Sequence, residues 1–170
     1  GSIITPQARG IRIHLDVSYQ NSLPKVRGEN LALKEVFVNI IDNAIQAMPK
    51  GGTLEIRTFQ KAKEVTISIR DTGCGMTAEV QRKLFDPFFT TKGPSGTGLG
   101  LSEALGIIKR HDGEIFVASA LNQGTTFSIR LPISESEHIA PEPTTVEETS
   151  KVSERLSLLV IDDNAHIREI

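Results

Sequence analysis

The chain has 170 residues, of which 38% are hydrophobic and 24% charged, and its 19 basic and 21 acidic side chains give a formal net charge of −2. These values are close to those of ordinary globular domains, so they exclude an intrinsically disordered, collagen-like or disulfide-rich protein. No apolar run approaches the ~20 residues that a membrane-spanning helix needs. A single cysteine, Cys74, excludes an internal disulfide and favours a reducing, cytoplasmic compartment.

Charge and composition divide the chain near residue 132. Residues 1–132 carry 16 basic and 12 acidic side chains, whereas residues 133–170 carry 3 basic and 9 acidic ones. The second part begins with a stretch rich in Glu, Ser, Thr and Pro, which predicts an acidic, flexible linker. We therefore expect four parts: a lead-in over 1–10 whose first two residues are typical of a cloning remnant, a folded domain over 11–132, the linker over 133–155, and the truncated start of a second domain over 156–170.

The period of the apolar residues predicts how the folded domain begins. Residues 11–17 alternate apolar and polar positions, as a half-buried strand does, and residues 23–26 are expected to form a short partner strand. From Glu29 to Met48 the apolar residues return every three or four positions. This spacing predicts an amphipathic helix, which Pro49 and the glycines after it would end.

The second half of the domain is predicted to hold four more strands, one long loop and a second helix. The loop contains six glycines and two prolines, and long loops in small domains commonly bind ligands. Gly113 is expected to end the second helix in the left-handed conformation. In chain order the predicted elements are a hairpin of strands over 53–59 and 65–70, the loop over 71–100, the helix over 99–111, and strands over 114–119 and 125–131.

Two asparagines stand out in the first helix. Asn39 and Asn43 are four residues apart, so their amides point to the same side of the helix. Asparagine is a poor helix former, and its amide oxygen is a suitable ligand for Mg²⁺, while its NH₂ group is able to donate to phosphate. Taken alone, the pair is also consistent with a solvated polar face.

A short acidic turn follows the strand over 65–70. Asp71 stands at the end of that strand, and Gly73 and Gly75 would let the backbone approach a flat ring closely. A carboxylate in this place is able to accept a hydrogen bond from an exocyclic amino group. The same residues are typical of an ordinary turn, and Cys74 between the glycines is interpreted as filler rather than as a reactive thiol.

Two further segments of the long loop suit phosphate binding. Residues 96–101, GTGLGL, open the second helix, where free backbone N–H groups favour an anion, although they match neither a Walker loop nor a dinucleotide fingerprint. A flexible loop with close helix packing is the alternative. Residues 85–92, FDPFFTTK, hold three of the seven phenylalanines, which fits core packing or a lid whose Thr91 and Lys92 reach phosphate.

These segments together carry a family resemblance. The order N-x-x-x-N-A, D-x-G-x-G, F-x-P-F-F-T-T-K and G-T-G-L-G-L, closed by GTTFSIRLP at 124–132, resembles the N, G1, F and G2 boxes of the ATP-binding catalytic domain of sensor histidine kinases. This resemblance covers residues 10–132. Residues 158–170, LLVIDDNAHIREI, are similar to the opening of a response-regulator receiver domain, so the arrangement resembles a hybrid histidine kinase.

The resemblance implies a fold and a set of ligand contacts. The family fold is an α/β (α+β) two-layer sandwich of the histidine kinase and gyrase ATPase type, the Bergerat fold, with three helices over one face of a mixed sheet. Asn39, Asn43 and Lys92 would be the catalytic residues, with Asn43 holding Mg²⁺ and Asp71 binding the adenine amino group. The remaining ATP contacts would come from Ala47, Gly73, Gly75 and Met76, from Thr90 and Thr91, from the backbone of Gly96, Thr97, Gly98, Leu99, Gly100 and Leu101, and from Thr126 through water.

Departures from related families refine the implied mechanism. In gyrase-type and mismatch-repair ATPases the position of Asn39 holds a glutamate that activates water, and an amide cannot act as a general base. Glu35 lies one turn away and is a poor substitute. Gln46 stands where many sensor kinases have a lysine, which leaves Lys92 as the cationic phosphate contact. The lid, from about Thr77 to Ser95, is short, as in nitrogen-regulation sensor kinases.

The implied function is transfer of the γ-phosphoryl group of Mg-ATP to a histidine on dimerisation helices outside these 170 residues. None of the four histidines has the expected sequence around it. The implied partners are those helices and a receiver domain or response regulator, in a homodimeric full-length protein with or without a membrane anchor; we expect no nucleic-acid partner and no membrane segment here. Two alternatives stay open: an ATP-hydrolysing clamp of the gyrase type, and a nucleotide-sensing module without transfer.

Overall fold

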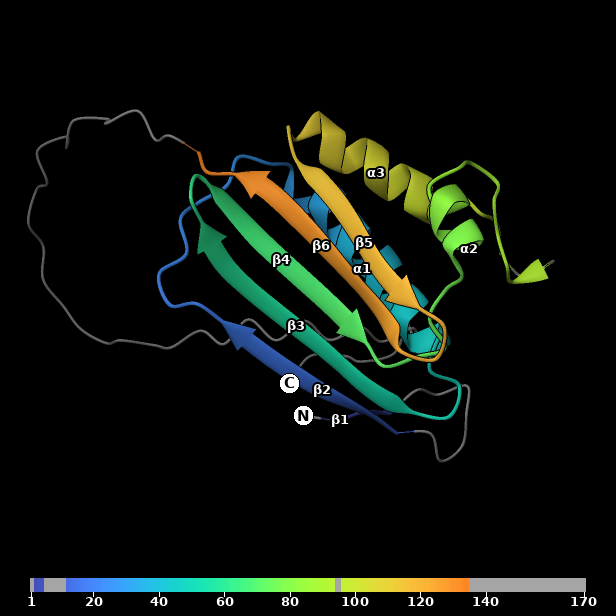
Figure 1. The fold of residues 1–170 in the computed structure, drawn as a ribbon. Coiled ribbons are helices and arrows are strands. Elements are labelled where there is room, and N and C mark those ends of the chain that lie inside the picture. The colour runs from blue at the N-terminus through green and yellow to red at the C-terminus, as the bar shows by residue number, and fades with distance from the viewer. Residues whose placement is uncertain (1, 5–11, 94–95, 135–170) are drawn as a thin grey trace, which may run out of the picture. The chain divides into compact units, whose positions relative to one another are not determined.

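A computed structural model describes residues 2–4, 12–93 and 96–134 (Figure 1). Within these residues one mixed sheet has six strands in the order β1-β2-β3-β4-β6-β5, in which only the β2–β3 pair is parallel. The strands are β1 (Ser2–Ile4), β2 (Arg12–Tyr19), β3 (Gly52–Lys61), β4 (Glu64–Asp71), β5 (Glu114–Ala120) and β6 (Gly124–Pro132). The helices are α1 (Asn30–Gln46), α2 (Ala78–Lys83) and α3 (Gly100–Arg110).

The two long helices, α1 and α3, pack on the same face of the sheet (Figure 1). The core lies between these layers, where Ile40 and Ile41 of α1 and Ile108 of α3 meet Leu54 and Ile129 of the sheet. Full burial of each such side chain contributes about 1.5–3 kcal/mol to the free energy of unfolding. This arrangement confirms the predicted two-layer α/β sandwich.

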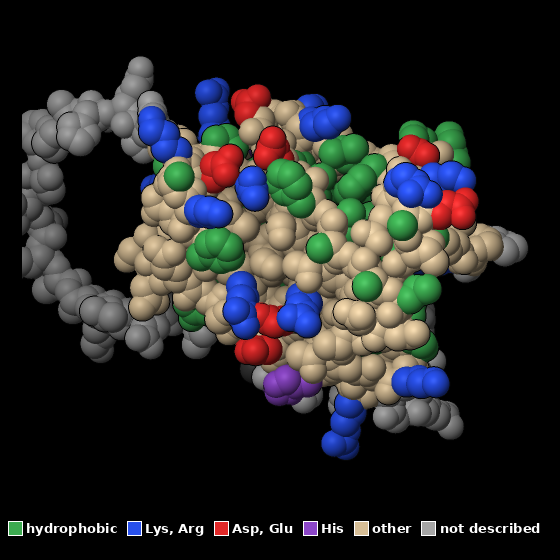
Figure 2. Space-filling model, viewed as in Figure 1, with side chains coloured by type: hydrophobic (Ala, Val, Ile, Leu, Met, Phe, Trp, Pro, Cys, Tyr) green, Lys and Arg blue, Asp and Glu red, His purple; other side chains and the backbone are tan. Residues whose placement is uncertain are grey.

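The opposite face of the sheet faces the viewer in Figure 2, where basic, acidic and hydrophobic side chains are interspersed. Strand alternation produces this division, because Ile69 and Phe127 are paired toward the core while their neighbours point outward. On the outer face the Arg130 guanidinium lies 4.4 Å from the centre of the Phe116 ring. The alternating pattern therefore leaves one hydrophobic and one mixed surface.

The structure departs from the predicted elements at one sheet edge and at one helix end. Residues 23–26 form no strand and supply only an isolated bridge from Val26 to Ile133; the antiparallel partner of β2 is instead β1, which was not predicted. At the end of α3 the left-handed residue is Asp112, with φ of 54°, and not Gly113. The presence of a glycine at position 113 has another explanation, because a Cβ there would lie 2.6 Å from the Arg130 carbonyl oxygen.

The predicted loop over 71–100 contains one short helix, α2, which the glycine and proline content concealed. Thr77 begins this helix, because its Oγ1 accepts a hydrogen bond from the Val80 N–H at 3.2 Å. The predictions for the linker and for the second domain fall almost wholly on residues 135–170, outside the described residues. Ile133 and Ser134 are described, and their N–H groups donate to Lys63 and Lys25 carbonyl oxygens, so the domain continues two residues past the predicted boundary.

Candidate functional site

A cavity of about 550 Å³ opens where the end of α1, the end of β4, the α2 segment and the start of α3 meet. Its volume is in the range of small-ligand and cofactor sites. Each of the four motifs singled out in the sequence contributes to its wall. The lining residues are Asn39, Asp42, Asn43, Gln46, Ala47, Asp71, Cys74, Gly75, Met76, Val80, Leu84, Phe89, Thr90, Thr91, Lys92, Gly96, Thr97, Gly98, Gly100, Leu101, Thr125 and Phe127.

Asp71 is the buried acid of this cavity, with only 2% of its surface exposed. Its Oδ1 accepts hydrogen bonds from the Gly73 N–H at 2.8 Å and from the Thr125 N–H at 3.3 Å. Burial raises the pKa of this carboxyl group above its ordinary value, and the two backbone hydrogen bonds oppose that rise. Both bonds go to Oδ1, so Oδ2 is the oxygen that a ligand in the cavity would meet.

The turn after Asp71 is held against two other elements. A Cβ on Gly73 would lie 2.5 Å from the Ala47 carbonyl oxygen, and a Cβ on Gly75, whose φ is 63°, would overlap the Ala120 carbonyl oxygen. Only glycine fits both positions. The Cys74 N–H donates to the same Ala47 oxygen at 3.0 Å. The turn is therefore fixed to the end of α1 on one side and to β5 on the other.

Side chains that the sequence analysis did not predict secure the next part of the wall. The Met76 N–H donates to Ser119 Oγ at 2.9 Å, and Gln81 Nε2 donates to the carbonyl oxygens of Ser119 at 2.9 Å and Met76 at 3.3 Å. Gln81 thus ties α2 to β5. Ser119 and Gln81 lie 38 residues apart in the chain and belong to no motif, so only their pairing in the fold reveals this role.

The two α1 asparagines are half-buried and engaged, which excludes the solvated polar face. Asn43 Nδ2 donates to the Asn39 carbonyl oxygen at 2.8 Å, and Asn43 Oδ1 accepts from Lys92 Nζ at 2.5 Å. Asn39 Nδ2 donates to the Gly100 carbonyl oxygen at 3.2 Å. These hydrogen bonds therefore join the lid, α1 and the GTGLGL segment at this end of the cavity.

Lys92 lies in a partly desolvated position. Burial lowers the pKa of its ammonium group below the ordinary value, and the nearby Asp42 carboxylate opposes that change. The contact between a cation and Asn43 Oδ1 shows that this oxygen is directed into the cavity and attracts positive charge. Because Mg²⁺ in nucleotide sites takes one or two protein oxygens and completes its shell with phosphate and water, a single amide oxygen fits it. Among the described residues no group of three or more His, Cys, Asp or Glu side chains could hold a metal by itself.

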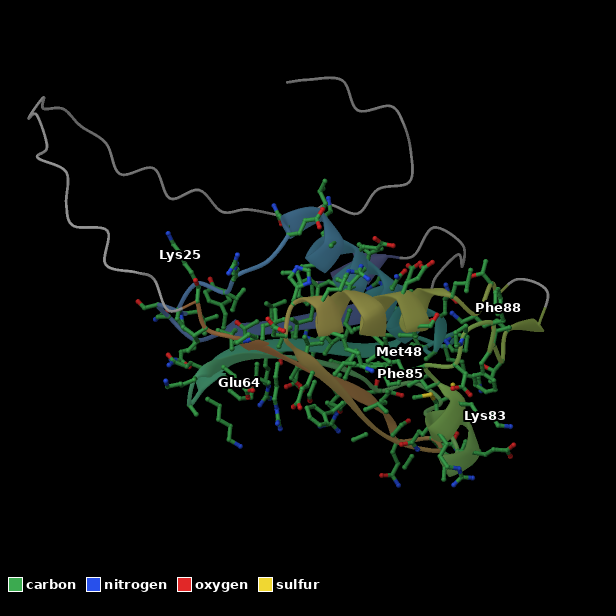
Figure 3. All side chains as sticks on the ribbon, turned by 90° about the horizontal axis from the view of Figure 1, so that it is seen from above. Lys25, Met48, Glu64, Lys83, Phe85 and Phe88 are labelled. Carbon is green, nitrogen blue, oxygen red and sulfur yellow. The ribbon has the colours of Figure 1, made fainter. Side chains whose placement is uncertain are left out.

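The three phenylalanines of the lid have three different environments. Phe85 packs against the core, Phe89 lines the cavity, and Phe88 is 75% exposed. In Figure 3 Met48 and Phe85 lie in the interior, and Phe88 lies at the outer end of the lid. Phe88 has a φ of 66°, and its N–H donates to the Gly98 carbonyl oxygen at 2.9 Å. The core-packing interpretation therefore holds for Phe85, whereas Phe88 and Phe89 lie outside the core cluster.

Three of the expected contact residues are absent from the cavity wall. Gly73 supports Asp71 from behind, and Leu99 is the N-cap of α3. Thr126 pairs with Arg70 and points to the outer face of the sheet, whereas Thr125, 5% exposed, lines the cavity. Because successive strand residues face opposite sides, an error of one residue moved this expected contact to the wrong face.

Comparison with known proteins places the chain in a family. Residues 28–135 match the model described as histidine kinase-, DNA gyrase B- and HSP90-like ATPase. The chain belongs to this family. The matched segment contains all of the cavity wall, from Asn39 to Phe127. The relatives below are named as histidine kinases, so this is an ATP-binding catalytic domain of the histidine kinase type.

Two curated relatives illustrate the match. The chain is 41% identical over 136 residues to the signal transduction histidine-protein kinase AtoS of Escherichia coli, an alignment that covers 78% of this chain and 22% of AtoS. It is 44% identical over 108 residues to sporulation kinase C of Bacillus subtilis, covering 64% of this chain and 25% of that kinase. The chain thus spans about a quarter or less of the length of these relatives.

Solved structures show the same fold. The mycobacterial sensor histidine kinase MprB superimposes with a TM-score of 0.64 at 28% identity, covering 71% of this chain and 82% of that chain. A nucleotide-free catalytic domain of histidine kinase ThkA gives a TM-score of 0.64 at 33% identity, with 71% and 80% covered. No helix in the described part of the chain is long and apolar enough to cross a membrane.

Proposed function

We propose that this domain binds Mg-ATP and transfers the γ-phosphoryl group to a histidine on a dimerisation domain outside the 170 residues. The observation that carries the proposal is the meeting of Asp71, Asn43, Lys92 and the start of α3 around one cavity. These groups form two chemically different ends, a buried carboxylate for a base and a set of cationic and N–H donors for phosphates. An adenine nucleotide has matching ends.

At the base end, Asp71 Oδ2 would accept from the exocyclic amino group of adenine. Its partner oxygen is already fixed by two backbone donors, so the free oxygen is held in one direction. Gly75 and Met76 would lie against the ring, since both line the cavity and the glycine carries no side chain to obstruct it. This end recognises the base without any contribution from the phosphates.

At the phosphate end, the first turn of α3 presents backbone N–H groups that make no bond within the helix. These groups, the positive end of the helix macrodipole and the Lys92 ammonium would neutralise phosphate oxygens. Asn43 Oδ1 would hold Mg²⁺, which would supply positive charge to neutralise the phosphates. Lys92 contacts this same oxygen at 2.5 Å, so it would move toward phosphate when the metal binds.

In the transfer step the bond between the γ-phosphorus and the β–γ bridging oxygen breaks, and a bond from phosphorus to an imidazole nitrogen forms. ADP leaves with the electron pair of the broken bond. The protein would contribute position and charge neutralisation rather than proton removal. The Asn39 amide is bonded to Gly100 and cannot accept a proton, which favours transfer over hydrolysis.

The partners of this reaction follow from the same proposal. The acceptor histidine would lie on dimerisation helices of the full-length protein, which would act as a homodimer in the cytoplasm, with or without a membrane anchor. A response regulator, or a receiver domain beginning in residues 156–170, would take the phosphoryl group onward. The relative CckA of Brucella abortus, named a sensor kinase, aligns with 94% of this chain at 34% identity, which supports a related arrangement.

The direct experiment incubates the 170-residue chain, ATP labelled at the γ-phosphate, and the cognate dimerisation domain. The expected result is acid-labile label on the histidine of that domain, and none when the histidine is replaced by Gln. A folded, ATP-binding chain that leaves the domain unlabelled while releasing inorganic phosphate would instead support the hydrolysing clamp. ATP binding with neither product would support the nucleotide-sensing module.

A further inference from the structure

Asn39 lies in the middle of α1, and its side chain makes the contact between the two long helices at the cavity. Asn39 Nδ2 donates to the Gly100 carbonyl oxygen at 3.2 Å, across 61 residues of sequence. The neighbouring α1 residues Ile40 and Ile41 belong to the core, so this part of α1 has a fixed position. A hydrogen bond from it therefore limits where the first residue of α3 lies.

The presence of a glycine at position 100 has a steric explanation, which points to the same contact. A Cβ on Gly100 would lie 3.3 Å from both Cγ and Oδ1 of Asn39, which is tighter than ordinary van der Waals contact. Gly100 does not have a positive φ, so its backbone conformation does not require glycine. As the first residue of a helix it would otherwise favour alanine by up to about 1 kcal/mol. The glycine at this position is explained by the close approach of Asn39.

Besides this bond, the first turn of α3 is held by Leu101, which packs against the core, and by the Ser102 hydroxyl, which donates to the Leu99 carbonyl oxygen at 2.7 Å. Leu99, the N-cap residue of α3, makes no side-chain capping hydrogen bond. The next two residues, Gly100 and Leu101, line the cavity. The N–H groups of this first turn are the donors that the proposed function assigns to phosphate. Their direction depends on where α3 begins, and a shift of about 1 Å is enough to weaken such contacts.

We infer that Asn39 is a positioning residue: it pairs with Gly100 to set the place of the α3 N-terminus, and it acts on the phosphates through that helix instead of contacting Mg²⁺. This inference rests on the proposed nucleotide site and deepens it. It assigns to Asn39 a positioning role in place of the catalytic role that the family resemblance implies. It also gives a reason for the third glycine of the GTGLGL segment.

The test measures the affinity of the 170-residue chain for ADP and for adenosine, each with Mg²⁺ and with EDTA. Asn39→Ala should weaken ADP binding about 3- to 10-fold, the size expected for one lost hydrogen bond, in both conditions, and should leave adenosine binding unchanged. Gly100→Ala should also weaken ADP binding, because its methyl group displaces Asn39. In the double variant Asn39→Ala/Gly100→Ala there is room for that methyl group, so ADP affinity should equal that of Asn39→Ala within about twofold.

Gly106→Ala is the matched control, since it adds the same methyl group in the same helix. The nearest atom to a Cβ there is the Arg110 guanidinium at 3.6 Å, so ADP affinity should not change. If Asn39→Ala fails to fold, Asn39→Ser, which keeps a donor on a shorter side chain, replaces it in the same cycle.

Three outcomes would overturn the inference. A loss of ADP affinity that disappears in EDTA would assign Asn39 to the metal, independent effects of the two substitutions would separate Asn39 from Gly100, and an equal loss of adenosine affinity would indicate a general structural defect. A wild-type chain that binds neither ADP nor adenosine would contradict the proposed function itself.

Discussion

The two ends of the cavity are built in different ways. At the Asp71 end, buried side chains and backbone groups are joined by hydrogen bonds among β4, β5, β6 and α2. At the Lys92 end, the lid contributes exposed residues, and its Phe88 holds a left-handed backbone conformation beside Gly98. The first end is preformed, and the second depends on few contacts. The comparison predicts that a change at the Asp71 end affects nucleotide binding more than a change at the Lys92 end.

The largest expected effect comes from changing the preformed end. The Asp71→Asn side chain has one oxygen and one NH₂ group. If the NH₂ group faces the adenine amino group, two donors oppose each other; if it faces the two backbone N–H groups, their hydrogen bonds are lost. ATP affinity should therefore fall about 100-fold or more. Thermal stability should not fall, because the substitution removes a buried charge. Calorimetric titration and a melting curve on the same sample measure the two quantities. Retained ATP binding would contradict the assignment of Asp71 to the base.

The pH dependence of stability gives a second view of Asp71. Burial raises the pKa of Asp71 in the folded chain above its ordinary value of 3.8, so folding favours the protonated form. The contribution of this group to stability is fully present below pH 3.8 and is lost as the pH rises through the folded-state pKa. The difference in melting temperature between Asp71→Asn and wild type should therefore increase in favour of the variant from pH 3.5 upward. A difference independent of pH would contradict a buried, ionised Asp71.

At the lid end the effect should be smaller and confined to phosphates. Lys92→Met keeps the length of the side chain and removes its charge, so ATP affinity should fall about tenfold while adenosine affinity stays the same. The matched control is Lys83→Met in α2, whose ammonium pairs with Glu79 on the surface and away from the cavity wall. Parallel loss of adenosine binding would mean that the two ends are not separable.

The smallest effect concerns the helix behind the phosphate end. Gly106 lies within α3, and a Cβ there would make only an ordinary contact with the Arg110 guanidinium at 3.6 Å, so Gly106→Ala should raise the free energy of unfolding by about 0.5–1 kcal/mol. Because Gly106 is not part of the cavity wall, ATP affinity should stay unchanged. Denaturant unfolding measures the first quantity and nucleotide titration the second; a change in ATP affinity would show that the interior of α3 also controls the phosphate end.

The sequence predicted those features that depend on local pattern. Periodicity predicted both long helices and every strand of the described sheet except β1, and the four motifs supplied most of the cavity wall. The pattern did not reveal Ser119 and Gln81, because their roles arise from a pairing across 38 residues of chain. It placed Thr126 instead of Thr125 at the cavity, because a one-residue error in a strand reverses the face.

The glycines show the same difference between what local pattern predicts and what contacts between distant residues determine. The sequence correctly indicated that glycines gather where backbones approach closely, but it could not tell which neighbour requires each one. A Cβ at Gly75 would overlap the Ala120 carbonyl oxygen, one at Gly113 would lie 2.6 Å from the Arg130 carbonyl oxygen, and one at Gly100 would lie 3.3 Å from the Asn39 amide. Each of these neighbours comes from a distant part of the chain. Composition and spacing therefore locate such positions, and only the fold explains them.

Hydrogen–deuterium exchange of the 170-residue chain, with and without a non-hydrolysable Mg-ATP analogue, tests most directly whether the two ends form one nucleotide site. Before nucleotide is added, amides at Met76 and Thr125 should exchange slowly and those in residues 91–93 and 96–101 quickly. The analogue should then protect residues 96–101 and the turn after Asp71 together, and Asp71→Asn should abolish both effects. Protection of one end without the other, or protection that survives in Asp71→Asn, would contradict a single site built from both ends.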